Sequence, residues 1–123
     1  MSELRFTKEH CWCRADGDEL TCGISDYAQG QMSELTFVEL PETGRTVKAG
    51  EAVAVVESVK AANDVFAPVA GTVTAANAEL ESRPELVNED PYGEGWIFKM
   101  RAADASAVEG LLSREEYEAG VGG

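Results

Sequence analysis

One lysine lies in a segment whose neighbours are mostly small or apolar, VESVKAANDV at residues 56–65. The amine of Lys60 could be a solvated charge, a catalytic nucleophile or a point of covalent attachment. A nucleophilic amine needs a pKa lowered by burial or by a nearby cation, and no second Lys or Arg lies close to Lys60 in the sequence. Residue type and position alone favour a solvated charge, with covalent attachment as the functional alternative.

Three cysteines and a single histidine are the other side chains that could carry chemistry. Cys11, Cys13 and Cys22 are odd in number in a chain long enough to form a core without crosslinks, which argues against a disulfide framework. A strand would place Cys11 and Cys13 on one side, but a structural metal site needs further ligands, so we expect reduced thiols and no metal. For His10 we expect a structural role, packed against Trp12, rather than proton transfer.

The composition is that of an ordinary globular protein. The 123 residues are 44% hydrophobic and 27% charged, which suffices for one core but is short for two domains. We therefore expect one domain over residues 1–123. The formal net charge of −13 repels nucleic-acid phosphates, so no nucleic-acid partner is expected. Either solubility or attraction to basic surfaces on partner proteins would explain this acidity.

The sequence contains no recognisable targeting or membrane-spanning segment. No apolar run approaches the roughly 20 residues that cross a membrane, and residues 1–5 lack the apolar core of a signal peptide. We therefore expect a cytoplasmic protein that acts as a monomer and does not associate with membranes.

Strand-like and turn-like patterns alternate in the N-terminal third. Apolar and β-branched runs predict strands over residues 4–6, 11–14, 20–24 and 35–40, with a hairpin turn at 15–18. Ser25 could cap a helix that begins at Asp26, and Gly30 is expected to keep that helix short. This part of the chain is therefore predicted to be rich in β-structure.

Residues 47–75 hold the most informative pattern of the chain. Their alanines could support a helix, but the many valines and the interrupting Pro68 favour two strands. If the strands pair as a hairpin, its tip falls near residues 58–63. Lys60 then lies on a turn in water, and the small Ala61 and Ala62 leave its amine accessible.

The C-terminal third mixes short helices with one strand. Short helical segments are predicted at 77–80 and 84–87, a loop at 91–95 and a strand at 96–100. Two Ser/Glu pairs at capping-box spacing predict a helical C-terminal segment at about 104–119, broken or in two pieces. These pairs are Ser106 with Glu109 and Ser113 with Glu116. The segment should pack through Leu111, Leu112 and Tyr117.

The lysine segment resembles the lipoylation hairpin of the glycine cleavage system H-protein family. The resemblance rests on residues 57–61, with the valines of 53–56 before them and 64–71 after them. Further family-like blocks follow in the family's order at residues 7–12, 23–29, 37–41 and 85–96. Biotin carriers share such a hairpin but normally place methionines beside the lysine, where this chain has Val59 and Ala61.

The resemblance implies a mainly β fold, the barrel-sandwich hybrid of lipoyl and biotinyl carriers, with short helices and a helical C-terminus. It implies a non-catalytic carrier with lipoate joined to Lys60 as an amide. Glu57 and Ala61 would flank the tip that a lipoate-attaching enzyme recognises, although Glu57 could equally serve only solubility. The implied partners are a pyridoxal-phosphate-dependent glycine decarboxylase, a tetrahydrofolate-dependent aminomethyltransferase and a flavin-dependent dihydrolipoyl dehydrogenase.

One position departs from the family pattern with consequences for the arm. The family usually has a glutamate between the histidine and the tryptophan, where it helps hold the aminomethylated arm in a surface cleft, and here that residue is Cys11. A neutral thiol replaces a carboxylate poorly in binding an ammonium group. Glu9 or Asp64 could compensate beside His10, or Cys11 could form a mixed disulfide with the arm.

Three functional hypotheses remain open at the level of sequence. The first is a lipoyl carrier of glycine cleavage. The second is a lipoyl carrier of a related pathway, in lipoyl relay or sulfur metabolism, which the Cys11 replacement keeps open. The third is an unmodified protein-binding module in which Lys60 is only a surface charge.

Overall fold

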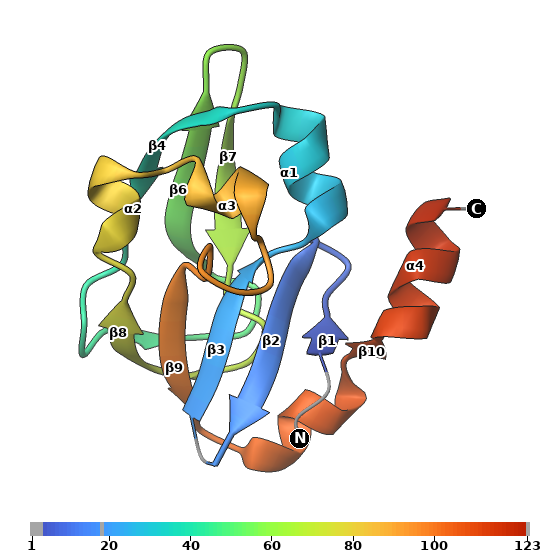
Figure 1. Cartoon of the computed structure of the whole chain (residues 1–123). Helices are drawn as coiled ribbons and strands as arrows, with labels where there is room; N and C mark the ends of the chain where they lie inside the picture. The colour runs from blue at the N-terminus through green and yellow to red at the C-terminus, as the bar shows by residue number, and fades with distance from the viewer. Residues whose placement is uncertain (1–3, 18, 123) are drawn as a thin grey trace.

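The computed structural model describes residues 4–17 and 19–122, and the strands in these residues form two antiparallel sheets (Figure 1). The larger sheet has seven strands, in the order β10 (Leu112–Ser113), β1 (Leu4–Phe6), β2 (Cys11–Asp16), β3 (Glu19–Ile24), β9 (Phe98–Ala102), β8 (Gly71–Ala76) and β5 (Thr46–Val47). The smaller sheet has three strands, in the order β4 (Leu35–Glu39), β6 (Ala52–Ser58) and β7 (Ala62–Phe66). This architecture confirms the predicted mainly β fold.

Short helices connect and flank the sheets. They are α1 (Asp26–Met32), α2 (Glu79–Ser82), α3 (Leu86–Glu89), the 3₁₀ helix η1 (Ala105–Gly110) and α4 (Arg114–Gly122). In Figure 1, α1, α2 and α3 gather around the smaller sheet, whereas α4 lies outside β1 and β10. No helix in the described part of the chain is long and apolar enough to cross a membrane.

The buried side chains form two clusters. The larger one joins inward-facing residues of both sheets, including Cys22, Val56, Val65 and Phe98. A smaller cluster of Phe6, Trp12 and Tyr117 brings α4 against β1 and β2. Side chains of β2 enter the two clusters alternately, because successive side chains point to opposite faces of a sheet.

The predicted lysine hairpin is confirmed as β6 and β7. Val56 pairs with Asn63, and Glu57 pairs with Ala62. Val53, Ala54, Val56 and Val65 are buried, so apolar packing fixes the lower part of the hairpin against the core. The upper end projects past β4 and α1 (Figure 1), and the chain reverses at Val59 and Lys60.

The helix after Ser25 is longer than the sequence predicted. Ser25 is its N-cap, with Oγ accepting a hydrogen bond of 3.1 Å from the Ala28 N–H, but α1 continues through Gly30 to Met32. A glycine inside a helix costs about 1 kcal/mol relative to alanine. Met32 is 3% exposed, and burying a methionine side chain contributes about 2 kcal/mol, which is enough to offset that cost.

Three elements begin two residues later than predicted. The helix α2 begins at Glu79 and not at 77, α3 begins at Leu86 and not at 84, and β9 begins at Phe98 and not at 96. The capping prediction at Ser106 is wrong, because Asp104 caps η1 and accepts hydrogen bonds from Ser106. The C-terminal segment is also not purely helical, because β10 lies between η1 and α4.

Ser113 and Glu116 make the predicted capping box. The Glu116 N–H donates to Ser113 Oγ, and the Ser113 N–H donates to Glu116 Oε1. These two hydrogen bonds satisfy backbone donors at the start of α4, which therefore begins immediately after β10.

Candidate functional site

The amine of Lys60 stands at the tip of the β6–β7 hairpin. The Ser58 N–H donates a 2.8 Å hydrogen bond to the Ala61 carbonyl and closes the turn, while the Lys60 N–H reaches Ser58 Oγ at 3.4 Å. Lys60 and Ala61 are exposed, and Val59 is 89% exposed. One backbone hydrogen bond and one hydrogen bond to a serine side chain therefore hold the root of the lysine while its side chain stays in water.

Glu57 flanks this tip at the end of β6. It pairs with Phe37 on β4 and with Ala62 on β7, so its backbone is held from both sides. Its carbonyl accepts a hydrogen bond from Thr36 Oγ1 at 3.3 Å. A strand held on both sides gives the residues before Lys60 a fixed direction, which suits recognition by another protein.

A cleft of about 320 Å³ lies between α1 and the hairpin. Polar and apolar side chains share its lining, which comprises His10, Ile24, Tyr27, Ala28, Gln31, Met32, Val56, Asn63 and Asp64. Asp64 lies four positions after Lys60, which is about 13 Å along an extended strand. A group extended from Lys60 and folded back along the hairpin would therefore meet this cleft.

The turn between β1 and β2 brings His10 to the cleft. The His10 N–H donates to the Thr7 carbonyl at 3.1 Å, and His10 adopts φ of 69°, a left-handed conformation in which histidine is enriched among non-glycine residues. The imidazole packs against Tyr27 with ring centroids 5.1 Å apart, and its Nδ1 lies 2.6 Å from the hydroxyl of Tyr117.

The expected packing of His10 on Trp12 is wrong. Among the described residues, the ring contacts of His10 are with Tyr27 and Tyr117, whereas the ring of Trp12 makes an edge contact with Tyr92 at 5.8 Å between centroids. The partner of His10 is instead Tyr117 of α4, whose hydroxyl also lies 2.6 Å from Ser25 Oγ. Burial raises the pKa of Tyr117, so its hydroxyl stays protonated at neutral pH.

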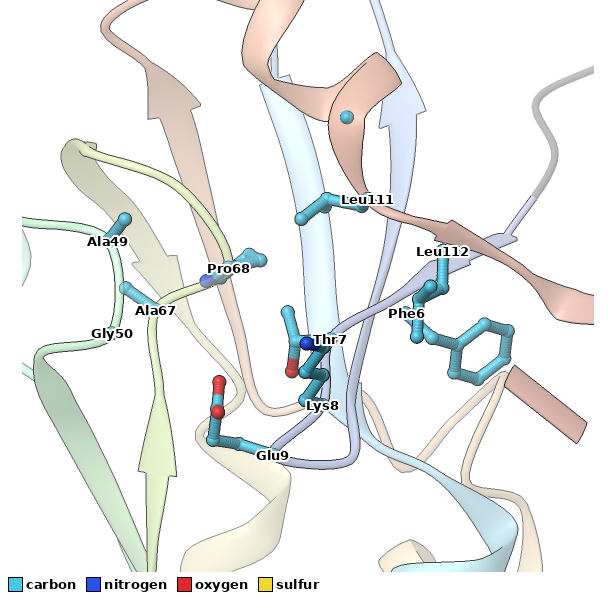
Figure 2. Close-up of a pocket in the computed structure, with 11 residues that line it drawn as sticks. Phe6, Thr7, Lys8, Glu9, Ala49, Gly50, Ala67, Pro68, Leu111 and Leu112 are labelled. Atoms are coloured by element: carbon cyan, nitrogen blue, oxygen red, sulfur yellow. The ribbon is translucent and has the colours of Figure 1, made fainter. Parts of the chain in front are cut away.

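Glu9 lines a different cavity. That cavity measures about 390 Å³ and lies between the β1–β2 turn and residues Ala67 and Pro68, as Figure 2 shows. Of the four candidate arm contacts, the structure brings His10 and Asp64 into one cleft and leaves Glu9 outside it.

Cys11 also does not line the cleft, because its side chain belongs to the core between the sheets. It is 1% exposed, and burial raises its pKa well above the ordinary value of 9.0. A buried, protonated thiol does not attack a disulfide, because the thiolate is the reactive form. No group of His, Cys, Asp and Glu side chains among the described residues could hold a metal ion.

The family model of the glycine cleavage H-protein matches residues 4–122 of this chain. The chain belongs to the glycine cleavage H-protein family. A glycine cleavage system H protein of Pseudoalteromonas atlantica is 53% identical over 118 residues, which are 95% of this chain and 92% of that protein. One of Thermus thermophilus is 53% identical over 113 residues, covering 92% and 88%.

A solved structure shares the fold as well as the sequence. The crystal structure of a glycine cleavage system H protein from Mycobacterium marinum matches with a TM-score of 0.88 and 35% identity, covering 98% of this chain and 97% of that one. The resemblance predicted from the sequence is thereby confirmed. As a glycine cleavage H-protein, the chain is a carrier component of the glycine cleavage system.

Lipoate is the group that glycine cleavage H-proteins carry, and the residues present here suit it. Lys60 offers an exposed primary amine for an amide bond, at the tip of the hairpin that borders the cleft. Apolar Ile24, Met32 and Val56 line the cleft together with polar Asp64. Such a lining suits a hydrocarbon chain that ends in a polar or charged load.

The contributions of α1 and of Tyr117 to the site are not visible in the sequence. Tyr27 and Gln31 are four residues apart, a spacing that places them on one face of a helix, but only the fold shows that this face meets the hairpin. The contact of Tyr117 with His10 spans 107 residues and leaves no local signal.

Proposed function

We propose that this H-protein carries lipoate on the Nζ atom of Lys60 and presents it to the other enzymes of glycine cleavage. The observation that carries the proposal is the exposed lysine on a turn closed by the backbone hydrogen bond from Ser58 to Ala61, within a chain of this family. When attached, lipoate would supply a disulfide that is reduced as one sulfur takes up the aminomethyl group of glycine, and the dithiol left after transfer of that group would be reoxidised to the disulfide. The protein itself acts as a non-catalytic carrier.

The proposed partners each meet the same hairpin tip. They are a pyridoxal-phosphate-dependent glycine decarboxylase, a tetrahydrofolate-dependent aminomethyltransferase, dihydrolipoyl dehydrogenase and the enzyme that attaches lipoate. Because the root at Lys60 is fixed, docking confines the tethered group near the partner's site at an effective concentration of order millimolar. Glu57 and Ala61 are the proposed recognition flank for the attaching enzyme.

The cleft beside the hairpin is the proposed resting place of the loaded arm. The carboxylate of Asp64 would attract the positive charge of an aminomethyl load, and His10 and Asn63 offer further polar atoms. The apolar side chains of Met32 and Val56 would exclude water from the carried chain. We leave Cys11 and Glu9 out of these contacts, because neither lines the cleft.

Intact-mass measurement of protein produced with lipoate tests the attachment site. We expect one lipoyl group on the wild-type chain and on a Lys8→Arg control, which alters another exposed lysine. Lys60→Arg should carry none. A wild-type chain that stays unmodified would favour the unmodified binding module, and a lipoylated Lys60→Arg variant would place the attachment elsewhere.

The pathway is tested with the purified decarboxylase. Exchange of labelled carbon dioxide with glycine should depend on the lipoylated wild-type protein and be absent with Lys60→Arg. Lipoylated protein that does not support exchange would point to lipoyl relay or sulfur metabolism. No structural observation favours that second candidate, because Cys11, which kept it open, lies in the core.

A further inference from the structure

Three polar side chains form a buried line that ends at the cleft. The Ala28 N–H donates to Ser25 Oγ at 3.1 Å, Ser25 Oγ lies 2.6 Å from Tyr117 Oη, and Tyr117 Oη lies 2.6 Å from His10 Nδ1. The line joins the start of α1, the helix α4 and the β1–β2 turn. Each separation suits a hydrogen bond, so the hydroxyl protons must be distributed consistently along the whole line.

The burial of Ser25 decides where those protons lie. Ser25 is 0% exposed, and among the described residues its Oγ has hydrogen bonds with the Ala28 N–H and with Tyr117 Oη. The amide can only donate, so the hydroxyl hydrogen of Ser25 must point to Tyr117 or remain buried without an acceptor. The hydrogen of Tyr117 is then left for His10 Nδ1.

We propose that Tyr117 is a positioning residue that holds neutral His10 in the tautomer with its proton on Nε2. This inference rests on the proposed function, in which His10 lines the cleft of the loaded arm. Nδ1 accepts from Tyr117, so the nitrogen left for the cleft is an N–H donor. His10 therefore offers the carried group a hydrogen-bond donor and does not act as a base.

The three hydrogen bonds of this line all point the same way, so they are cooperative. Each hydroxyl donates once and accepts once, from the Ala28 amide through Ser25 and Tyr117 to the imidazole. Aligned hydrogen bonds strengthen one another. The reverse arrangement, with a proton on Nδ1, would strand the hydroxyl hydrogen of Ser25 inside the protein.

The first test needs no substitution and no lipoyl group. His10 is the only histidine of the chain, so isotope-labelled histidine gives one set of ring-nitrogen chemical shifts by NMR. We expect Nε2 in the protonated range and Nδ1 in the unprotonated, hydrogen-bonded range at a pH where the ring is neutral. A proton on Nδ1, or an even mixture of tautomers, would overturn the proposal.

The second test removes one hydroxyl at a time. Tyr117→Phe should shift the Nδ1 resonance and mix the tautomers, while Tyr92→Phe should leave both ring nitrogens as in the wild type. Tyr92 is a matched control because its hydroxyl accepts a 2.9 Å hydrogen bond from the Asp26 N–H, whereas the hydroxyl between Ser25 and His10 is that of Tyr117. Backbone amide spectra report whether each variant is folded. Unchanged His10 shifts in folded Tyr117→Phe would refute the positioning role.

The third test measures the loaded arm. Lipoylated, aminomethyl-loaded protein should release ammonia up to about twofold faster with Tyr117→Phe than with Tyr92→Phe, because an even mixture of tautomers leaves the Nε2–H donor in about half of the molecules. Wild-type protein that releases ammonia as fast as a free aminomethylated dihydrolipoamide would refute the cleft in the proposed function. If the wild type releases ammonia slowly and the two variants release it at the same rate as each other, the role of Tyr117 is refuted.

Discussion

Cys13 lies directly opposite Cys22 in the register of β2 and β3, and both side chains are fully buried. Cys11 precedes Cys13 by two residues and faces the same core. Burial raises the pKa of Cys13 to about 12. Burial also raises the pKa of Cys22, and the nearby Cys11 and Cys13 raise it further. The core thus contains three thiols that stay protonated in the folded state.

These thiols make the folded state sensitive to alkali. In the unfolded chain each thiol ionises near its ordinary pKa of 9.0, while the folded thiol keeps its proton. The unfolded state then binds fewer protons, so the free energy of unfolding falls as the pH rises from about 9 towards 12. Each thiol contributes a slope of about 1.4 kcal/mol per pH unit.

Urea denaturation between about pH 8 and pH 11 measures this slope. Cys13→Ala should reduce the alkaline slope by about 1.4 kcal/mol per pH unit, whatever its effect on stability at neutral pH. A variant whose slope matches the wild type would show that Cys13 ionises equally in both states.

Trp12 covers Gly23 so closely that no side chain fits there. A Cβ at Gly23 would lie 2.8 Å from Nε1 of Trp12, whose ring is fully buried. Gly23→Ala should therefore lower the free energy of unfolding by about 1 to 3 kcal/mol. Gly30→Ala is the matched control, because Gly30 is helical with open space around it and should gain about 0.5 to 1 kcal/mol. Thermal unfolding of both variants checks the opposite signs.

Ser33 carries backbone strain between α1 and β4. Its φ of 66° and ψ of −164° lie in a region that is essentially restricted to glycine. Ser33→Gly should raise the free energy of unfolding by about 1 kcal/mol, since the relieved strain exceeds the entropy that glycine adds to the unfolded chain. Ser33→Ala keeps the Cβ and should gain nothing. Equal stability of these two variants in urea denaturation would argue against strain at this position.

Asp64 and Glu9 are two carboxylates that line different cavities: Asp64 lines the cleft beside the hairpin, and Glu9 lines the cavity beside Ala67 and Pro68. Asp64→Asn should speed ammonia release from aminomethyl-loaded protein about two- to fivefold, because it removes one charge from the cleft. Glu9→Gln removes the same charge from the other cavity and should leave the rate unchanged. A larger effect at Glu9 than at Asp64 would reverse our assignment of the cleft.

The sequence was most informative where local physics decides the structure. The hairpin around Lys60 follows from dense valines, from Pro68 and from a short polar tip, and β6 and β7 form as predicted. Gly30 misled the helix prediction, because the gain from burying Met32 depends on the fold and is invisible in a local pattern.

The site was less predictable because its contacts are long-range. A period of two shows that Cys11 and Trp12 point to opposite faces, but it does not show which face meets the larger core. In the structure Cys11 faces that core, and Trp12 faces the smaller cluster with Phe6 and Tyr117. The glutamate-to-cysteine departure therefore drew attention to a side chain that does not reach the cleft.

The 107 residues between His10 and Tyr117 have a consequence for biosynthesis. A ribosome makes the histidine early and the tyrosine late, so a nascent chain that ends before α4 cannot yet orient its imidazole. If Tyr117 holds the imidazole as we propose, a product that ends before α4 leaves the tautomer of His10 unfixed, so the donor offered to a carried load depends on the last residues that the ribosome adds.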